Sequence, residues 1–241
     1  MARLARLSLG GELHLILQRG NNAQPVFQDD ADRTSYLEKL AASAPACGLA
    51  VHAYALLPNQ VHLLATPASA DSLSQCMQTL GRSYVASFNR RHGRTGTLWE
   101  GRFRATVVEA DRHFLDALVY VDTAAERAGL GAAWPWSSTA HHRGQRRDPL
   151  VSEHRAFWAL GNTPFDREAA YQALLARGLS AAQVEQFSQA QHKGWVLGSP
   201  AFLAAMAQRT ERPLAPRPRG RPRKAAPAAD ALPPDGEQSE N

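Results

Sequence analysis

The sequence predicts an α+β fold with a ferredoxin-like, RRM-like split βαβ core and an antiparallel sheet. Strand-like and helix-like segments alternate in the order strand, helix, strand, strand, helix, strand, helix, which is the split βαβ pattern. From residue 150 to 208 the chain is rich in Ala and Leu, which predicts a helical extension. Beyond residue 209 it is rich in Pro, Ala, Arg and Gly, which predicts a disordered basic tail.

The first half of the core is a strand, a helix and a hairpin. Leu13 to Leu17 is an apolar run and predicts the first strand. A helix is expected to start near Asp29, Asp30 and Asp32, because carboxylates favour the positive end of the helix dipole, and it should stop before Pro45. Two β-rich runs, Ala50 to Leu57 and Val61 to Thr66, flank a Pro-Asn turn and predict the second and third strands.

The second half of the core adds a long helix, a strand and another helix. Ser72 begins a helix whose apolar residues recur at helical spacing as far as Arg91. Phe103 to Val108 predicts the fourth strand. A last helix should begin at Asp111 and end at Gly129. Antiparallel pairing then places strands one and three in the centre of the sheet.

Composition limits the class of protein. The 241 residues are 44% hydrophobic, which suits one medium domain with appendages. The net charge of +5, carried mostly by arginine, favours a polyanionic partner, although a GC-rich genome also favours Arg codons. Two cysteines imply no disulfide framework, and no apolar run is long enough to span a membrane. We therefore expect a cytoplasmic, nucleoid-associated protein with no membrane partner.

We divide the chain into residues 1–140, the core domain; 150–208, the helical extension; and 209–241, the tail. The tail contains PRPRGRPRK, whose centre resembles an AT-hook. In that module a glycine lies deep in the minor groove, and flanking arginines, here Arg219 and Arg221, enter a narrow A·T groove. A generic basic tail is the alternative.

Three core residues have side chains suited to phosphoryl transfer. Gln60 and His62 are two apart on the third strand, so they share a face, and both side chains can bind a divalent cation. Tyr120 lies on the last core helix, and its phenol can form a phosphotyrosine ester. Taken singly, each is more often a structural residue.

Arginines are concentrated between the second core helix and the fourth strand, with Glu100 the only acid among them. Arginine neutralises backbone phosphates, and the interleaved aromatic rings can stack on unpaired bases, so the segment predicts DNA binding. A solvated helix end and loop is the alternative. The DNA-binding candidates are Arg82, Arg90, Arg91, Arg94, Arg102 and Arg104. The interleaved aromatic residues are Tyr84, Phe88, Trp99 and Phe103.

The chain resembles the REP-associated tyrosine transposases, members of the HUH single-tyrosine transposase family, from about Leu13 to Ser138. The likeness is carried in order by HAYALLPNQVHLLATP, GRSYVASFNRRHGRTGTLWEGRFRATVVE, FLDALVYVDTAAERAGL and PWSS, and it continues through KGWVLGSPAF. The resemblance implies that a metal on a histidine pair polarises a DNA phosphate. A helical tyrosine then attacks, leaving a 5′-phosphotyrosine and a free 3′-OH. The tyrosine matches Tyr120, and the second histidine matches His62.

Two positions depart from the family pattern. Gln60 replaces the first histidine, and Ala124 replaces a polar residue that completes the metal site one helical turn after the tyrosine. Because an amide is a weak neutral donor, we expect weak binding of Mg²⁺ or Mn²⁺ and slow or absent cleavage. Glu126 or Asp122 could serve as the missing metal ligand, although Asp122, two residues from Tyr120, should lie on the wrong side of the helix to share a ligand face with it.

We therefore expect a transposase-like protein that binds single-stranded DNA hairpins and cleaves and joins strands through a phosphotyrosine. The alternative is a catalytically weakened, domesticated DNA-binding module. RNA binding is a third interpretation, because ferredoxin-like sheets also host RNA-recognition modules, but strands one and four lack the aromatic pattern of those modules. Expected partners are DNA hairpins and, through the tail, A·T-rich duplex. A homodimer is left open.

Overall fold

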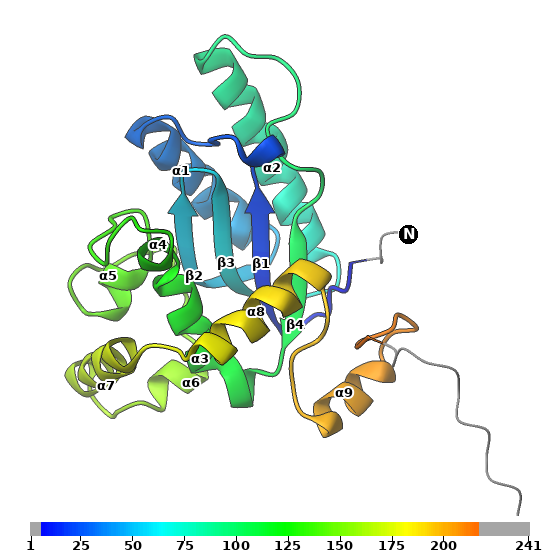
Figure 1. Cartoon of the computed structure of the whole chain (residues 1–241), viewed down its shortest axis with the longest axis vertical. Coiled ribbons are helices and arrows are strands. Elements are labelled where there is room, and N and C mark those ends of the chain that lie inside the picture. The colour runs from blue at the N-terminus through cyan, green and yellow to red at the C-terminus, as the bar shows by residue number, and fades with distance from the viewer. Residues whose placement is uncertain (1–5, 217–241) are drawn as a thin grey trace, which may run out of the picture.

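A four-stranded antiparallel sheet forms the centre of the protein, with the order β2-β3-β1-β4 (Figure 1). The computed structural model describes residues 6–216, so Arg219 and Arg221 of the predicted AT-hook lie outside the described residues. The strands are β1 (Leu13–Arg19), β2 (Leu49–Leu57), β3 (Gln60–Pro67) and β4 (Arg104–Val108). The α+β class and the central position of strands one and three are thereby confirmed.

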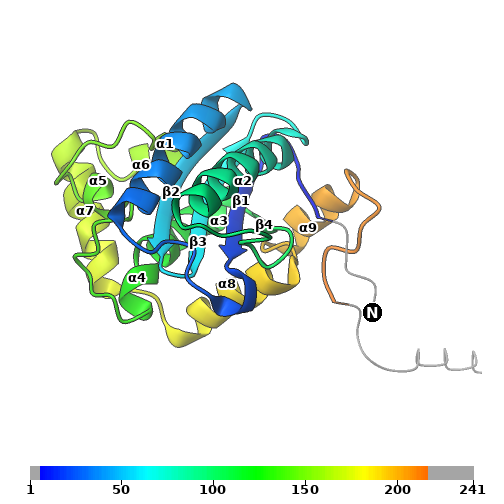
Figure 2. The ribbon, with the colours of Figure 1, turned by 90° about the horizontal axis from the view of Figure 1, so that it is seen from above.

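Helices cover both faces of the sheet (Figure 2). Alternation along the strands explains this, because neighbouring residues point to opposite faces. Ile16, Val61 and Leu63 pack beneath α1 and α2, whereas Leu15 and Leu64 pack beneath α3 and α8. The covering helices are α1 (Asp30–Ala46), α2 (Ser72–Arg91), α3 (Ala110–Asp122) and α8 (Ala181–Lys193).

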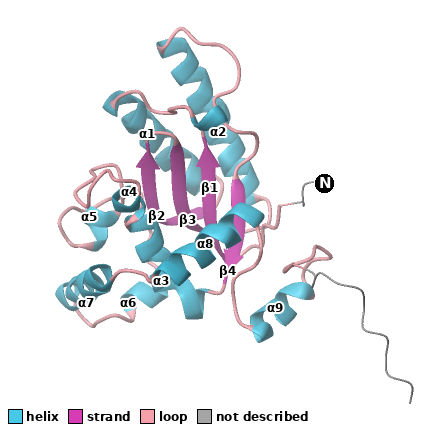
Figure 3. Ribbon diagram, in the orientation of Figure 1, coloured by secondary structure: helices cyan, strands magenta, loops and turns pink. Residues whose placement is uncertain are grey.

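Further helices complete the described part of the chain (Figure 3). The helix predicted from Asp111 to Gly129 is in fact two helices, because the chain leaves helical geometry at Thr123. The Thr123 hydroxyl donates to the carbonyl of Val119 at 2.6 Å, a local bond that competes with regular helix geometry. The remaining elements are η1 (Asn21–Ala23), α4 (Ala124–Arg127), α5 (Thr139–His142), α6 (Arg155–Trp158), α7 (Pro164–Arg177) and α9 (Pro200–Ala207).

The first helix also differs from the prediction at its end. We expected it to stop before Pro45, but α1 includes Pro45 and ends at Ala46. Proline in the last turn removes only one backbone hydrogen bond, which the helix end tolerates. Gly48, with φ of +65°, then turns the chain into β2.

The helical extension packs on the core. Phe157, Tyr171 and Phe187 of the extension share one apolar cluster with Phe114 and Tyr120 of α3. Good capping supports this part of the chain, since α7 and α8 each begin with a capping box. The extension therefore helps to build the environment of Tyr120, while the division into three regions stays a prediction.

Part of the region assigned to the tail is also packed. Leu214 is buried in a cluster with Leu7 and Val107, and its carbonyl accepts from the backbone N–H of Val196 at 3.0 Å. The ordered chain thus extends beyond residue 209. Among residues 6–216, no helix combines the length and apolar character needed to cross a membrane.

Candidate active site

The fold brings His62 of β3 and Tyr120 of α3 together. His62 is fixed in the centre of the sheet, where it pairs with Leu17 of β1 and Ala55 of β2. Its ring centroid lies 6.1 Å from that of Tyr120, and the two rings meet nearly edge to face at 75°. Gln60 shares this face of β3 and lines the same pocket of about 540 Å³. The three predicted site residues therefore lie in one place.

Tyr120 is held tightly on both sides. Its side chain is 5% exposed, packs on Phe187 at a centroid distance of 5.2 Å, and lines the pocket. The guanidinium of Arg127 lies 4.3 Å from the ring centroid on a following helical turn. Burial raises the pKa of Tyr120, while Arg127 and a hydrogen bond with Ser188 act to lower it. The phenol is therefore protonated at neutral pH, and Arg127 favours its ionised form.

His62 is a neutral imidazole with spare hydrogen-bonding capacity. It is 6% exposed and makes no hydrogen bond with the described residues, and its Nδ1 atom is buried without a partner. Burial, followed by the positive charges of Arg127 and His192, lowers the pKa of His62 to about 3. At neutral pH one nitrogen of its ring is a donor and the other an acceptor, and neither bonds to another described residue.

Sequence reasoning missed Arg127, although helical spacing points to it. Arg127 is seven residues after Tyr120, which is about two turns along one face. Its guanidinium donates to the Tyr120 carbonyl at 2.6 Å and to the Thr123 hydroxyl at 2.5 Å. These bonds hold a permanent cation beside the phenol, where it can bind an anionic oxygen.

The candidate metal ligands around this pocket do not fit a tightly held divalent metal. Ala124 lines the pocket but has no ligating atom. Asp122 is buried, and its carboxylate accepts three hydrogen bonds from other parts of the protein, so it does not serve as the substitute ligand that we left open. Glu126 is exposed and is not among the pocket-lining residues. Gln60 and His62 therefore remain as the candidate metal ligands; both are uncharged, and both lie close to the cationic Arg127. In the described range, no group of three or more His, Cys, Asp or Glu is arranged to hold a metal.

The arginines of the arginine-rich segment differ in their surroundings. Arg91 is engaged in ion pairs with Asp29 and Asp32, and Arg94 lies over the ring of Phe88. Arg82 and Arg90 are exposed on α2, and the DNA-binding role of these arginines stays a prediction. Arg102 and Arg104 line a common pocket, which lies along β4.

The interleaved aromatic residues are not the stacking platforms that we expected. The most exposed of them, Phe103, is 8% accessible, and all four belong to the core beneath α1 and α2. The hydroxyl of Tyr84 donates to the carbonyl of Val26 at 2.6 Å, deep in that core. Their spacing reflects the apolar stripe of α2 and the loop that closes over it. The rings concerned are Tyr84, Phe88, Trp99 and Phe103.

Comparisons with known proteins give structural likenesses only. No protein-family model and no curated protein matches the chain. The structure is similar to a REP-associated tyrosine transposase solved with a REP hairpin, at 14% identity and a TM-score of 0.49, over 64% of this chain and 92% of that one. It is also similar to a candidate transposase from Deinococcus radiodurans R1, at 25% identity and a TM-score of 0.33, over 48% and 92%.

Proposed function

We propose that this protein is transposase-like: it binds single-stranded DNA hairpins and cleaves and joins strands through a 5′-phosphotyrosine at Tyr120. The observation that carries the proposal is the meeting of Tyr120 with His62, at 6.1 Å between ring centroids, in a pocket that also contains Arg127. A nucleophile, a neutral hydrogen-bond donor and a fixed cation are groups that can promote phosphoryl transfer. The net charge of +5 favours a polyanionic substrate.

The proposed step exchanges one phosphoester bond for another. The Tyr120 phenol loses its proton to solvent, and its oxygen attacks the phosphorus. A P–O(Tyr) bond forms, the bond from phosphorus to the 3′ oxygen breaks, and that oxygen takes a proton to become a 3′-OH. Arg127 and an N–H of neutral His62 bind the non-bridging oxygens, on which negative charge increases. Attack by a 3′-OH reverses the step and joins strands.

The proposal is tested by incubating the protein with end-labelled hairpin DNA that carries single-stranded flanks. We expect a covalent complex that survives denaturation, and weaker binding to duplex DNA and to RNA hairpins of the same sequence. Equal or tighter binding to RNA would contradict DNA as the substrate and would favour an RNA-binding function.

Replacing Arg127 by glutamine is expected to slow covalent attachment at pH 7 by about tenfold to a hundredfold. The charge and hydrogen bond of Arg127 lower the pKa of Tyr120, so their loss raises that pKa further. Because the phenolate is the attacking form, the rate should rise with pH in both proteins, and the profile of Arg127→Gln should lie at higher pH. Rates of adduct formation from pH 6 to 10 measure this. Arg127→Lys keeps the positive charge, so its rate of covalent attachment should fall less. Superimposable pH profiles for wild type and Arg127→Gln would contradict the proposed role of Arg127 beside Tyr120.

We also propose that Gln60 and His62 hold Mg²⁺ or Mn²⁺ only weakly. The double variant Gln60→His/Ala124→Asn should bind Mn²⁺ about tenfold or more tightly than the wild type, because it adds an imidazole and an amide donor. Calorimetric titration with Mn²⁺ measures the affinity, and circular dichroism verifies the fold. Adding His62→Gln to the double variant should remove the gain. Wild-type affinity equal to that of the double variant would contradict this assignment of the ligands.

A DNA-binding module without cleavage is the second candidate function. It is favoured by one observation: the pocket offers two neutral donors, and Ala124 adds none. Hairpin binding without a covalent complex in Mg²⁺, in Mn²⁺ and in metal-free buffer would support this module over the transposase-like reaction.

A further inference from the structure

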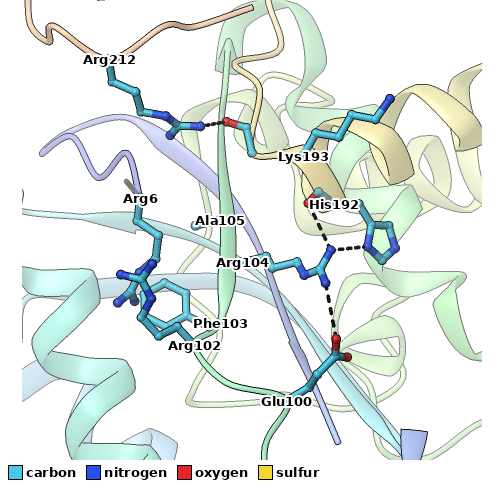
Figure 4. Close-up of a pocket in the computed structure, with 10 residues that line it drawn as sticks. Arg6, Glu100, Arg102, Phe103, Arg104, Ala105, His192, Lys193 and Arg212 are labelled. Carbon is cyan, nitrogen blue, oxygen red and sulfur yellow. Dashed lines mark hydrogen bonds and ion pairs between the residues drawn. The ribbon is translucent and has the colours of Figure 1, made fainter. Parts of the chain in front are cut away.

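A second pocket lies beside β4, at the edge of the sheet (Figure 4). Its volume is about 330 Å³, and it is built from segments far apart in the sequence. One segment precedes β1, one enters β4, one ends α8, and one follows α9. We call it the edge pocket. Its charged and titratable lining residues are Arg6, Glu100, Arg102, Arg104, His192, Lys193 and Arg212.

Positive charge dominates the edge pocket. Five of its lining residues are Arg or Lys, and Glu100 is the single acid among these described residues. Glu100 lies 3.6 Å from Arg104, so it offsets the charge of that side chain in particular. Arg102 and Lys193 make no ion pair or hydrogen bond with other described residues. Cations gathered in this way repel one another unless an anion lies between them.

Arg212 gives the pocket an unsatisfied donor. One of its guanidinium nitrogens donates to the carbonyl of Gly194, while Nε and Nη1 are buried without partners in the described part of the protein. A buried unpaired donor destabilises a protein, and more strongly when it is charged. An anion that enters beside Arg212 would relieve this cost, and a phosphate matches the planar fork of a guanidinium.

His192 connects the edge pocket with the pocket of Tyr120. It lines both cavities, so the two pockets are neighbours at this residue. Arg104 donates to Nδ1 of His192 at 3.0 Å and to its carbonyl at 3.1 Å, which fixes this side chain against the start of β4. A polyanion lying in the Tyr120 pocket therefore meets the edge pocket next along the surface.

We propose that the edge pocket binds a backbone phosphate of the same DNA strand whose scissile phosphate enters the Tyr120 pocket. Arg102, Lys193 and Arg212 bind this second phosphate, and the strand crosses His192 between the two sites. The assignment rests on the proposed function for the identity of the polymer. Free phosphate or a mononucleotide offers the same chemistry, and the experiment separates these sources from a strand.

The test compares two doubly neutralised proteins with the wild type. Arg102→Gln/Lys193→Gln removes two edge-pocket cations, and Lys193 and Arg102 are both exposed, so folding should be retained. Arg147→Gln/Arg177→Gln removes two exposed cations elsewhere and is the matched control. Affinity for a hairpin with single-stranded flanks is measured by fluorescence anisotropy at several salt concentrations. We expect at least tenfold weaker binding for the edge-pocket variant at low salt and less than threefold for the control. The log–log salt slope of the edge-pocket variant should fall by about 1.4, which corresponds to two single-strand phosphate contacts.

A second measurement locates the phosphate. Single neutral methylphosphonate linkages are moved along the flank, and one or two positions should weaken wild-type binding but not binding by the edge-pocket variant. The inference is overturned if the edge-pocket variant binds as the control does. It is also overturned if no linkage position matters while inorganic phosphate binds the wild type and not the variant, since the pocket then serves a free anion. Failure of the proposed reaction can be distinguished from failure of this inference. In that case strand binding would still depend on the edge pocket, but no covalent complex would form.

Discussion

Replacing Tyr120 by phenylalanine is expected to abolish covalent attachment to hairpin DNA, by roughly three orders of magnitude or more, while binding changes little. The substitution removes only the hydroxyl, which is the proposed nucleophile. The remaining ring can still pack against Phe187 and beneath Arg127, as the tyrosine ring does. A denaturing gel measures the covalent complex, and fluorescence anisotropy measures binding.

Tyr171→Phe is the matched control for this loss. Tyr171 is also fully buried, and its hydroxyl donates to Asp122 at 2.8 Å, away from the Tyr120 pocket lining. Below its unfolding temperature this variant should form the covalent complex as the wild type does. A Tyr120→Phe protein that still becomes attached to DNA would contradict the assignment of the nucleophile.

Replacing Asp122 by alanine is expected to destabilise the protein by about 3–5 kcal/mol, because it leaves buried partners unpaired. The carboxylate accepts from Ser138 at 2.7 Å, from His142 at 2.7 Å and from Tyr171 at 2.8 Å. The Asp122 carbonyl also accepts from the Thr139 hydroxyl at 2.9 Å. One residue thus fastens the end of α3, two positions after Tyr120, to α5 and α7.

Thermal unfolding measures this effect, and the midpoint should fall by about 10 °C. Asp111→Ala is the control, since Asp111 is exposed on the same helix and pairs only with the exposed Arg155 among the described residues. Its loss should change stability by about 1 kcal/mol or less. Similar shifts for the two variants would show that the Asp122 network does not fasten α3.

The sheet was predictable because its strands are short apolar runs separated by polar turns. Val61 to Thr66 has the composition of a strand, and the split βαβ order alone places that strand in the centre. Strands β1, β2 and β3 extend one or two residues further than predicted, and β4 begins one residue later, since pairing such as Arg19 with Gln60 depends on the partner strand. The break at Thr123 was not predictable from an apolar stripe that continues across it.

Of the candidate active site, sequence reasoning from the residues alone could predict only the part that lies on a single element. Gln60 and His62 share a strand face, but the identification of Tyr120 required the family resemblance, since nothing in its own helix distinguishes it from a core tyrosine. Arg91 shows the limit of linear clustering, because it meets Asp29 and Asp32, about 60 residues away in sequence, and its charge is used there. The ion-pair partners of a residue depend on tertiary contacts, which cannot be inferred from the clustering of charges along the sequence.

The edge pocket was beyond sequence reasoning for the same reason. Arg102 was among the predicted DNA-binding residues, but Arg6, Lys193 and Arg212 join it only because distant segments meet at β4. His192 has no distinguishing motif, yet it lies between the two pockets. Packing of the helical extension against the core brings these cations together at β4 and places His192 between the two pockets.

The most direct test of the Tyr120 assignment is to locate the nucleotide on the protein by mass spectrometry. Wild-type protein is incubated with hairpin DNA, digested with nuclease and protease, and searched for a phosphonucleotide on each tyrosine. The mechanism predicts the modification on the peptide that contains Tyr120, joined through a 5′-phosphate. Modification of another residue, or an unmodified Tyr120 in protein that demonstrably binds the hairpin, would contradict it.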